Sequence, residues 1–175
     1  MIQDWKQLYY NNKIVNNLNG FRGKYSILSN FAEHEKISII LPYGDTNGKK
    51  YFANNIETLF QAAKTNINWQ IEEIIKSNDP NVSKYLGRRC KIRNDWEEIK
   101  INVMKELLEK KFIVSNEFRH VLLSVPDDMY IVEMNRWCDK EWGVCSKTFQ
   151  GKNKLGKLLM NLKAEKKGKK NVDNK

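Results

Sequence analysis

The sequence predicts a mixed fold that is dominated by helices and contains one small β-hairpin. Several segments place apolar residues at the three- and four-residue spacing of helices that pack on a core, whereas one pair of short β-branched segments is joined by a turn. The clearest helical segments are 55–65, 69–77, 95–112 and 116–124. With 175 residues and 41% hydrophobic content, the chain is suited to one domain with short appendages.

The hairpin is expected from the segments 36–41 and 49–53. The turn between them contains Asn47-Gly48, a pair that tolerates the positive φ angles of tight hairpin turns. Its second strand leads directly into the helical segment 55–65. Near the N-terminus we expect a short helix over 4–9 and an Asn-rich loop over 11–20, and a further short strand is expected over 130–134.

Residues at helix ends support these assignments. Asp79 precedes Pro80 as an N-cap, and the helix that follows runs to about Leu86 and ends at Gly87. The longest helix begins after Asn94 or Asp95, and Glu97 or Glu98 would complete a capping box there. The last helix is expected to open after Gly151 and to run through Leu158, Leu159 and Met160.

The chain is basic, with a formal charge of +10. The tail 163–175 accounts for +4 of this charge and the body for +6. A basic body is compatible with phosphate-bearing ligands or nucleic acid, and equally with the general Lys, Asn and Ile bias of the sequence. We expect residues 164–175 to be a solvated, disordered end, because almost no apolar side chain is available there for burial.

The cysteine and histidine content argues against a structural zinc site. Cys90, Cys138 and Cys145 form no Cys-x-x-Cys pair, and only two histidines are present. We expect reduced thiols and a cytoplasmic protein. The N-terminus resembles no signal peptide, and no apolar stretch approaches the length of a membrane span, so no membrane partner is expected.

The helical segment 55–65 is the leading candidate for chemistry. Glu57, Gln61 and Lys64 recur at helical spacing and share one side, whereas Ile56, Leu59, Phe60 and Ala63 supply an apolar side. A carboxylate, an amide and an ammonium would therefore line up on a helix that packs against the core. The alternative is a solvated surface with a weak pattern of charged pairs.

Other segments combine polar and aromatic residues in the same way. Four cations between Arg88 and Arg93 suit phosphate oxygens or, equally, a solvated connection. The stretch 137–143 places two Trp residues around Asp139, which is typical of a ligand-contacting loop or of a packed aromatic loop. Gly151 and Gly156 around Asn153 could bring backbone N–H groups to a phosphate at a helix start.

Taken together, these residues resemble the NADAR (YbiA-like) family over 21–163, with 1–20 as an N-terminal extension. The resemblance rests on short motifs in the family's order: Phe21-x-Gly23, Leu28-Ser-Asn-Phe31, Glu57, Phe60-Gln-Ala, Lys64, Gly87-Arg, Asp95-Trp96, Met104, Lys111-Phe112, Glu133, Asp139-x-x-Trp142-Gly143, Gly151-x-Asn153-x-Leu155-Gly156 and Leu159-Met160. Two departures stand out. Ile56-Glu-Thr-Leu59 replaces the Ser-Glu-His-Tyr of many members, so that Thr58 bears on substrate choice, and Lys163 stands where Arg is common.

The resemblance implies a helix-dominated α+β domain with a small sheet that hydrolyses N-glycosidic bonds without a metal or cofactor. Cleavage of a C1′–N bond builds positive charge on the ribose, which a nearby carboxylate stabilises. The catalytic residues are expected to be Glu57, Asp139 and Lys64. The residues expected to bind substrate are Phe21, Gly23, Ser29, Asn30, Phe31, Gln61, Arg88, Trp96, Trp142, Gly143 and Asn153. Glu57, Lys64, Trp96, Asp139 and Trp142 are predicted to converge on one site.

The expected substrate is a base that carries ADP-ribose, such as guanine in DNA. The enzyme alternative is a ribosylaminopyrimidine phosphate, an early intermediate of riboflavin synthesis. An alternative from another class is a non-catalytic module that binds ADP-ribose or nucleotides. For the first substrate, an ADP-ribosyltransferase would be the functional partner.

Overall fold

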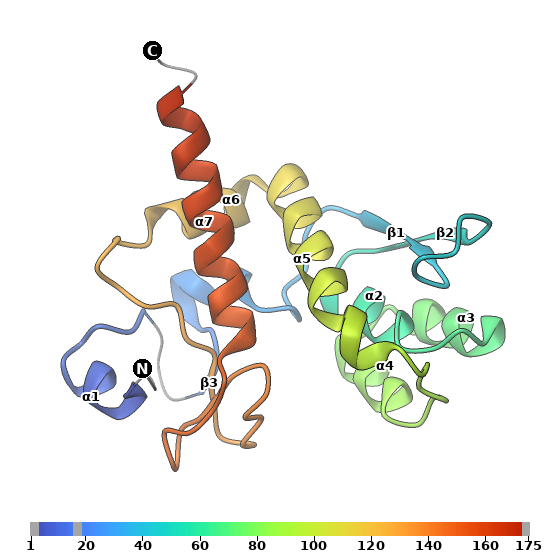
Figure 1. Ribbon diagram of the computed structural model, residues 1–175, viewed down its shortest axis with the longest axis horizontal. Coiled ribbons are helices and arrows are strands. Elements are labelled where there is room, and N and C mark those ends of the chain that lie inside the picture. Colours follow the sequence, from blue (N-terminus) through green and yellow to red (C-terminus); the bar gives the residue numbers. More distant parts are fainter. Residues whose placement is uncertain (1–3, 16–18, 173–175) are drawn as a thin grey trace. The chain divides into compact units, whose positions relative to one another are not determined.

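The computed structural model describes residues 4–15 and 19–172, the last four as backbone only. The chain divides into two compact units, which are residues 30–116 and, together, residues 1–29 with 117–175. We refer to them as the middle unit and the terminal unit. Helices dominate both, and the described strands form two small two-stranded sheets (Figure 1). The helix-dominated α+β class predicted from the sequence is therefore confirmed.

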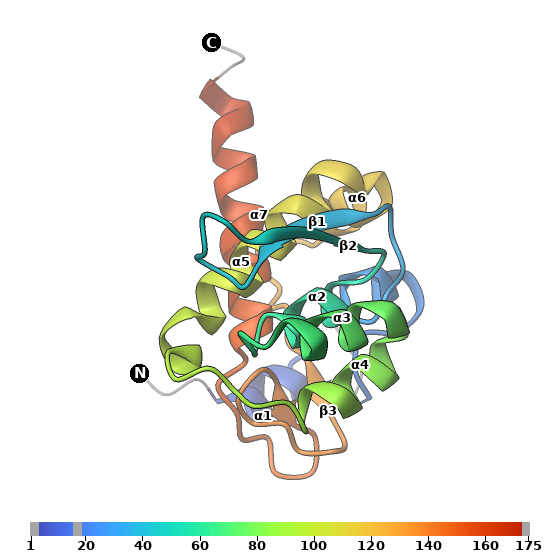
Figure 2. The same cartoon turned by 90° about the vertical axis from the view of Figure 1, so that its right-hand side faces the viewer.

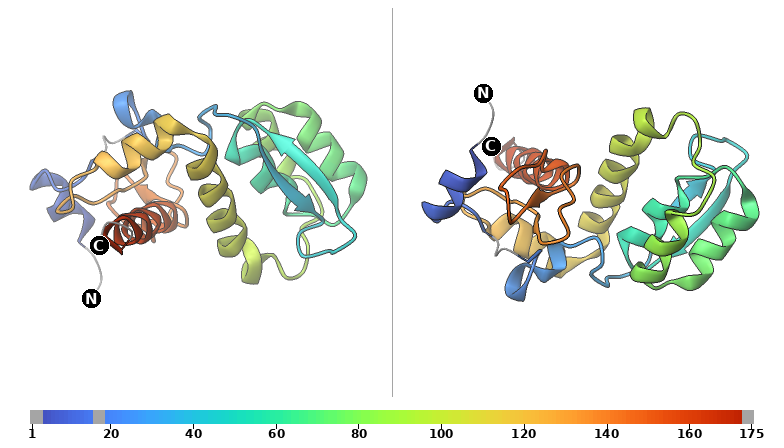
Figure 3. Two further views of the ribbon diagram at one scale, coloured as in Figure 1. Left: turned by 90° about the horizontal axis from the view of Figure 1, so that it is seen from above. Right: turned by 90° about the horizontal axis from the view of Figure 1, so that it is seen from below.

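The middle unit consists of a hairpin and four helices. Strands β1 (Ile37–Leu41) and β2 (Lys49–Ala53) pair antiparallel, with Ile39 opposite Tyr51. The helices that follow are α2 (Ile56–Ala62), α3 (Asn68–Ser77), α4 (Pro80–Gly87) and α5 (Trp96–Val114). β2 contacts α2 and α3 while β1 contacts α5, so the hairpin covers the helices on one side (Figures 2 and 3).

The hairpin turn differs from the prediction in its details. The residue with a positive φ angle is Gly44, at 83°, rather than Asn47 or Gly48. Gly48 is needed for another reason, since a Cβ atom there would lie 2.7 Å from Ile40 Cγ2 and 2.9 Å from the Leu41 carbonyl oxygen. Close approach to the first strand, not left-handed backbone, therefore explains this glycine.

One of the two predicted N-caps of the middle unit is present, and a further cap was not predicted. As predicted, the Asp79 side chain caps α4, where it accepts hydrogen bonds from the backbone N–H groups of Asn81 and Val82. The Asn55 side chain caps α2 by accepting a hydrogen bond from the Thr58 backbone N–H, a cap that was not predicted. The capping box before α5 was wrong. The Asp95 side chain makes no capping hydrogen bond, because its carboxylate binds the Arg93 guanidinium at 2.6 Å instead.

The terminal unit is built from both ends of the chain. It contains α1 (Trp5–Tyr10), a 3-10 helix η1 (Gly23–Leu28), α6 (Asn116–Ser124), the two-residue strands β3 (Met134–Asn135) and β4 (Val144–Cys145), and α7 (Lys154–Val172). β3 and β4 pair in parallel. The strand predicted over 130–134 is reduced to Met134 in β3 and an isolated bridge between Tyr130 and Ile14.

Apolar residues that are far apart in the sequence form the core of this unit. Trp5, Ile14, Val132, Met134 and Val144 are buried together. The Trp5 indole also donates a hydrogen bond of 3.0 Å to the Gly151 carbonyl oxygen. The N-terminal segment is thus part of the packed unit. Of the Asn-rich loop expected over 11–20, residues 16–18 lie outside the described part.

Two expectations about the terminal unit were wrong. Cys138 and Cys145 are joined by a disulfide rather than reduced, whereas Cys90 is free. A positive φ of 56° at Cys138 helps to bring the two Cα atoms within 4.2 Å of each other, which the seven-residue separation does not reveal. The tail expected to be disordered from residue 164 instead continues α7 to Val172, and residues 173–175 lie outside the described part.

Across the described residues, no helix is both long enough and apolar enough for a membrane span.

Candidate active site

Helix α2 is buried along its whole length, including its polar side. Glu57 retains 6% of its exposure and Gln61 retains 4%. The hairpin, α3, α4 and α5 all contact α2, and together they enclose it. The alternative of a solvated surface for Glu57 and Gln61 is therefore wrong. The structure places the Glu57 carboxylate inside the middle unit.

A hydrogen bond holds the Glu57 side chain. The Gln61 amide donates from Nε2 to Glu57 Oε1 at 2.7 Å, one helical turn away. The position of Gln61 depends in turn on Gly87 at the end of α4, since a Cβ atom at residue 87 would lie 2.0 Å from Gln61 Oε1. That oxygen is buried and has no hydrogen-bond partner in the described part of the chain. The close packing of Gly87 thus limits the position of Gln61, which in turn orients the Glu57 carboxylate.

Lys64 follows α2 and is partly buried. Burial lowers the pKa of its ammonium, and the negative charge of Glu57 opposes that shift. The positive charges of Lys84 and Arg88 also lower the pKa of Lys64. Lys64 therefore lies within electrostatic range of the buried carboxylate and of the cations Lys84 and Arg88, although the helix predicted to carry Lys64 ends at Ala62.

The segment before the hairpin borders the start of α2. The Asn30 carbonyl accepts a hydrogen bond of 3.0 Å from the Glu57 backbone N–H, and the buried Asn30 Oδ1 has no partner in the described part of the chain. The Lys84 ammonium lies 5.3 Å from the centre of the Phe31 ring. Asn30 and Phe31 are thus brought to the same end of the middle unit as Glu57.

Trp96 and Arg88 have different environments. The Trp96 indole is 7% exposed and packs against Phe60, with ring centres 5.0 Å apart. This contact places it in the core next to α2, where one edge at most can face a ligand. Arg88 lies at the end of α4 and is exposed, so its guanidinium is available to an anion.

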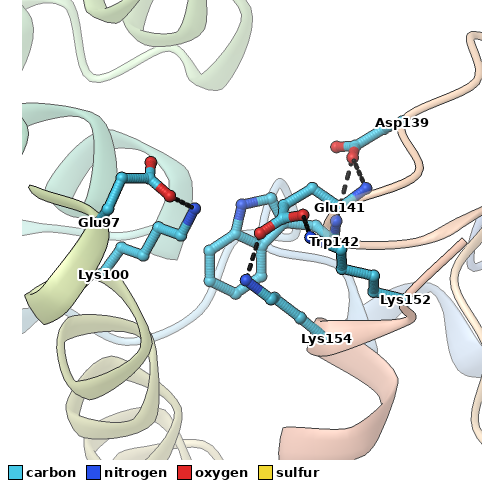
Figure 4. A network of polar contacts seen from close by, with 7 residues as sticks. All are labelled: Glu97, Lys100, Asp139, Glu141, Trp142, Lys152 and Lys154. Carbon is cyan, nitrogen blue, oxygen red and sulfur yellow. Dashed lines mark hydrogen bonds and ion pairs between the residues drawn. The ribbon is translucent and has the colours of Figure 1, made fainter.

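In the terminal unit, the Asp139 carboxylate organises its own loop. Asp139 Oδ1 accepts hydrogen bonds from the backbone N–H groups of Glu141 at 2.9 Å and Trp142 at 3.0 Å (Figure 4). The fully buried Asn135 side chain bonds to both the N–H and the carbonyl of Asp139. Glu141 forms ion pairs with Lys152 and Lys154 in the same view. One carboxylate oxygen of Asp139 therefore has a structural role.

The motif glycines and Asn153 hold this loop against α7. Asn153 is fully buried, and its side chain bonds to the backbone of Ile131 and Glu133. A Cβ atom at Gly143 would lie 2.2 Å from the Glu133 carbonyl oxygen, and one at Gly151 would lie 2.2 Å from the Gly143 carbonyl oxygen. These residues therefore serve backbone packing, and the amide of Asn153 is already occupied by protein groups.

The remaining residues predicted to contact substrate lie between residues 21 and 29, in the N-terminal segment of the terminal unit. Phe21 is buried, Gly23 adopts a positive φ of 55°, and Ser29 ends η1 and is partly buried. Nothing within 4 Å would meet a Cβ atom at Gly23, so its glycine character serves backbone conformation. Substrate contact by Phe21, Gly23 and Ser29 therefore stays a prediction.

Sequence reasoning missed two buried lysines of α5. Lys100 is 6% exposed and forms an ion pair with Glu97, while Lys111 is fully buried. Glu–Lys spacing on a helix is more often a mark of the surface, which conceals such residues. Lys111 belongs to the Lys111-Phe112 motif, and the signal that could have shown its burial is its position four residues after Leu107 on the longest helix.

The structure therefore brings Glu57, Gln61 and Lys64 together in the middle unit, with the cation of Arg88 nearby. Separately, it gathers Asp139, Trp142, Gly143 and Asn153 in the terminal unit. The convergence of both sets on one substrate stays a prediction. Within the described ranges, no group of three or more His, Cys, Asp and Glu residues is placed to hold a metal ion.

Comparison with known proteins relates this arrangement to a family. The family model of the NADAR domain matches residues 18–166. Over 88 residues the chain is 38% identical to an N-glycosidase from Nostoc punctiforme, which covers 49% of this chain and 54% of that protein. The chain thus spans about half the length of that relative.

Two further relatives match over more of the chain. A protein from Zea mays named riboflavin biosynthesis protein PYRR, chloroplastic, is 30% identical over 153 residues, covering 81% of this chain and 23% of that protein. The NMR structure of the Escherichia coli protein YbiA matches with a TM-score of 0.68 and 30% identity over 90% of both chains.

Proposed function

Because the chain belongs to the NADAR domain family, we propose that it is an N-glycosidase that cleaves the C1′–N bond of a phosphate-bearing ribose. The observation that carries this proposal is the buried Glu57 carboxylate, held at 2.7 Å by Gln61 and accompanied by Lys64. Burial of a carboxylate costs free energy, and ionisable groups in such environments are concentrated at functional sites. This arrangement suits stabilisation of a developing positive charge.

In the proposed reaction, the C1′–N bond breaks and its electron pair leaves with the base nitrogen. The ribose becomes cationic, and the negative charge of Glu57 stabilises it. Water then bonds to C1′ and gives up a proton to the carboxylate, while the base nitrogen gains a proton. Water is the only co-reactant.

The cations around Glu57 have two roles in this proposal. Arg88 is exposed and suited to phosphate oxygens, which a guanidinium binds with two parallel hydrogen bonds. Lys64 is partly buried, and burial lowers the pKa of its ammonium. A lowered pKa makes Lys64 a better proton donor to the leaving base than an exposed lysine.

The loop of Asp139 and Trp142 contributes to the same substrate in this proposal. Asp139 Oδ1 is bonded to two backbone N–H groups, and the carboxylate is thereby held in one orientation. A fixed carboxylate can accept hydrogen bonds from ribose hydroxyl groups, and the partly buried Trp142 indole can stack on the base. Trp96 is less suited to stacking because it already packs on Phe60.

We favour a base that carries ADP-ribose, such as guanine in DNA, as the substrate, with an ADP-ribosyltransferase as the functional partner. The chain's positive charge supports this choice. The second candidate is a ribosylaminopyrimidine phosphate, which the similarity to the maize riboflavin biosynthesis protein favours. A non-catalytic nucleotide-binding module is the alternative from another class.

Single-turnover cleavage assays distinguish these candidates. The chain is incubated separately with DNA that contains ADP-ribosylguanine and with ribosylaminopyrimidine phosphate, and the released sugar phosphate is measured together with equilibrium binding. Release from the first substrate alone supports the proposal. Release from the second alone would move the assignment to the riboflavin intermediate, and binding without any release would favour the non-catalytic module.

The variant Glu57→Gln tests the role of the carboxylate. It keeps the size of the side chain but removes its charge, so we expect the cleavage rate to fall by about 100-fold or more. Ground-state affinity should change much less, since the charge that Glu57 stabilises is absent from the substrate. Glu73→Gln is the matched control, because Glu73 is exposed on α3. Near-normal cleavage by Glu57→Gln would remove Glu57 from the mechanism.

A further inference from the structure

Helix α4 and the loop that follows form an unusually basic stretch. Between Pro80 and Asn94 there are five cations and no acidic residue. The cations are Lys84, Arg88, Arg89, Lys91 and Arg93. Arg93 is neutralised by its ion pair with Asp95. In the part of the chain that the structure describes, Arg88, Arg89 and Lys91 are exposed and form no ion pair.

An exposed aromatic ring lies among these cations. Tyr85 keeps 51% of its exposure, and the Arg89 guanidinium lies over its ring at 4.2 Å from the centre. The two residues are one helical turn apart, so this contact fixes a flat cationic platform on the outer side of α4. If the basic loop were only a solvated connection between helices, the exposed Tyr85 ring would have no explanation.

The platform extends towards α3. The Lys91 backbone N–H donates a hydrogen bond of 3.1 Å to Gln70 Oε1, which ties the loop to the first turn of that helix. Trp69, the neighbour of Gln70, is 63% exposed, and Ile92 is 50% exposed. Trp69 thus adds a second exposed aromatic side chain, on the helical turn to which the loop is tied.

We propose that the α4 face, defined here as Trp69, Tyr85, Arg88, Arg89 and Lys91, binds a single strand of nucleic acid. Unpaired cations attract the phosphate backbone, and exposed aromatic rings stack on bases that are not paired in a duplex. A duplex would offer its phosphates but conceal the faces of its bases. An acidic protein would match the charge but would not account for the aromatic rings.

This face is continuous with the candidate active site. Arg88 belongs to the face and follows Gly87, which packs closely against Gln61, the residue that hydrogen-bonds to Glu57. The loop is also tied to Lys64, because the Arg93 backbone N–H donates to the Lys64 carbonyl oxygen at 2.8 Å. A strand on the α4 face would therefore pass close to the carboxylate, as a modified base within DNA requires. The biological meaning of the face rests on the proposed function, because a free riboflavin intermediate carries no strand.

The test measures binding of the full chain to an unmodified, fluorescently labelled single-stranded oligothymidine of about 12 nucleotides. Fluorescence anisotropy is recorded between about 50 and 200 mM salt. We expect binding that weakens steeply with salt. The probe contains no cleavable bond, so the result is independent of whether the chain is an N-glycosidase.

Three variants assign the binding to the α4 face. Tyr85→Leu keeps the charge and should weaken binding about fivefold or more through lost stacking. Lys91→Ala should lower the slope of log affinity against log salt by about 0.7, the effect of one phosphate contact with a single strand. Lys76→Ala is the matched control, because Lys76 is exposed on α3 away from the loop and should leave affinity nearly unchanged.

Three results would overturn the proposal. They are the absence of binding by the unaltered chain at the lowest salt, equal losses in Lys76→Ala and Lys91→Ala, and normal binding by Tyr85→Leu. Vesicles that contain phosphatidylserine serve as a second probe. If they bind more tightly than the oligonucleotide and with the same dependence on Tyr85, the face recognises a lipid surface instead.

Discussion

Burial controls the charge of several side chains near α2. His34 illustrates this at the level of one residue. Burial lowers the pKa of its imidazole to about 4, and the positive charge of Lys111 adds to the shift. The His34 Nδ1–H donates to the Glu35 carbonyl oxygen at 2.6 Å, and Nε2 is buried without a partner in the described part of the chain. His34 is thus neutral in the folded protein.

This neutral histidine predicts acid sensitivity. Its pKa is 6.5 when unfolded and about 4 when folded, so the unfolded chain binds the proton more tightly. The free energy of unfolding therefore falls as the pH drops from 6.5 towards 4. His34→Gln should reduce that loss, as measured by urea unfolding at several pH values. An identical pH dependence in both proteins would contradict this account.

At the scale of elements, the loop 136–143, which joins the paired strands β3 and β4, is held by hydrogen bonds and close backbone contacts. Asn135 and Asn153 satisfy its buried polar groups, and Gly143, Gly151 and Gly156 allow the backbone segments to approach closely. The same loop carries the candidate residues Asp139 and Trp142. Its geometry is therefore a condition for the function that we propose.

Two substitutions at Asp139 separate its structural role from its chemical role. Asn can still accept the two backbone hydrogen bonds through Oδ1, whereas Ala cannot. We expect Asp139→Ala to lower the free energy of unfolding by about 1–2 kcal/mol and Asp139→Asn to lower it much less. Asp139→Asn should nevertheless weaken both cleavage and substrate binding if the carboxylate holds the ribose. Equal stability of the two variants would show that the loop does not depend on this side chain.

Glycine packing gives a second prediction at this scale. A Cβ atom at Gly156 would lie 2.1 Å from the Ile131 carbonyl oxygen, so Gly156→Ala forces α7 and the loop apart. We expect the melting temperature of the Gly156→Ala variant to be several degrees lower than that of the unaltered chain. Gly168 is the matched control on the same helix, because nothing lies within 4 Å of a Cβ atom there. Gly168→Ala should be neutral or slightly stabilising, since alanine favours helix.

At the scale of the whole molecule, both ends of the chain contribute to one unit. Trp5 lies in the core of the terminal unit, and α7 is joined to the 126–127 turn by Lys163 and Lys167. The Lys163 side chain is 9% exposed and also donates to the Pro126 carbonyl oxygen at 3.2 Å. The last described contact of α7 with the rest of the unit is therefore the ion pair of Lys167.

Truncation experiments can locate the end of the stable structure. Deleting residues 168–175 should leave the melting temperature nearly unchanged, because Gly168 is exposed and this stretch has almost no apolar side chain to bury. Lys163→Ala should lower it by several degrees, whereas Lys167→Ala, which removes a more exposed ion pair, should have a small effect. If deletion of residues 168–175 lowered the melting temperature by several degrees, this end of the chain would contribute to the stability of the fold.

The elements of this protein follow from the sequence by itself. Asp79 caps its helix as predicted, and the hairpin strands and most helix bounds lie within a few residues of their expected positions. Such signals act between residues only a few positions apart, so the sequence displays them directly. The side that Glu57 and Gln61 share on α2 was predicted for the same reason, whereas Lys64 lies two residues beyond the end of this helix.

Only the tertiary structure decided which polar groups are buried and what they bind. Whether the polar side of α2 faced water depended on the hairpin, α3, α4 and α5, which all enclose it. The binding of Asp95 by Arg93 displaced the expected capping box, and Asn153 bonds to backbone groups about 20 positions away. Burial and hydrogen bonding depend on segments that meet only in the folded chain, and no local pattern records which segments those are.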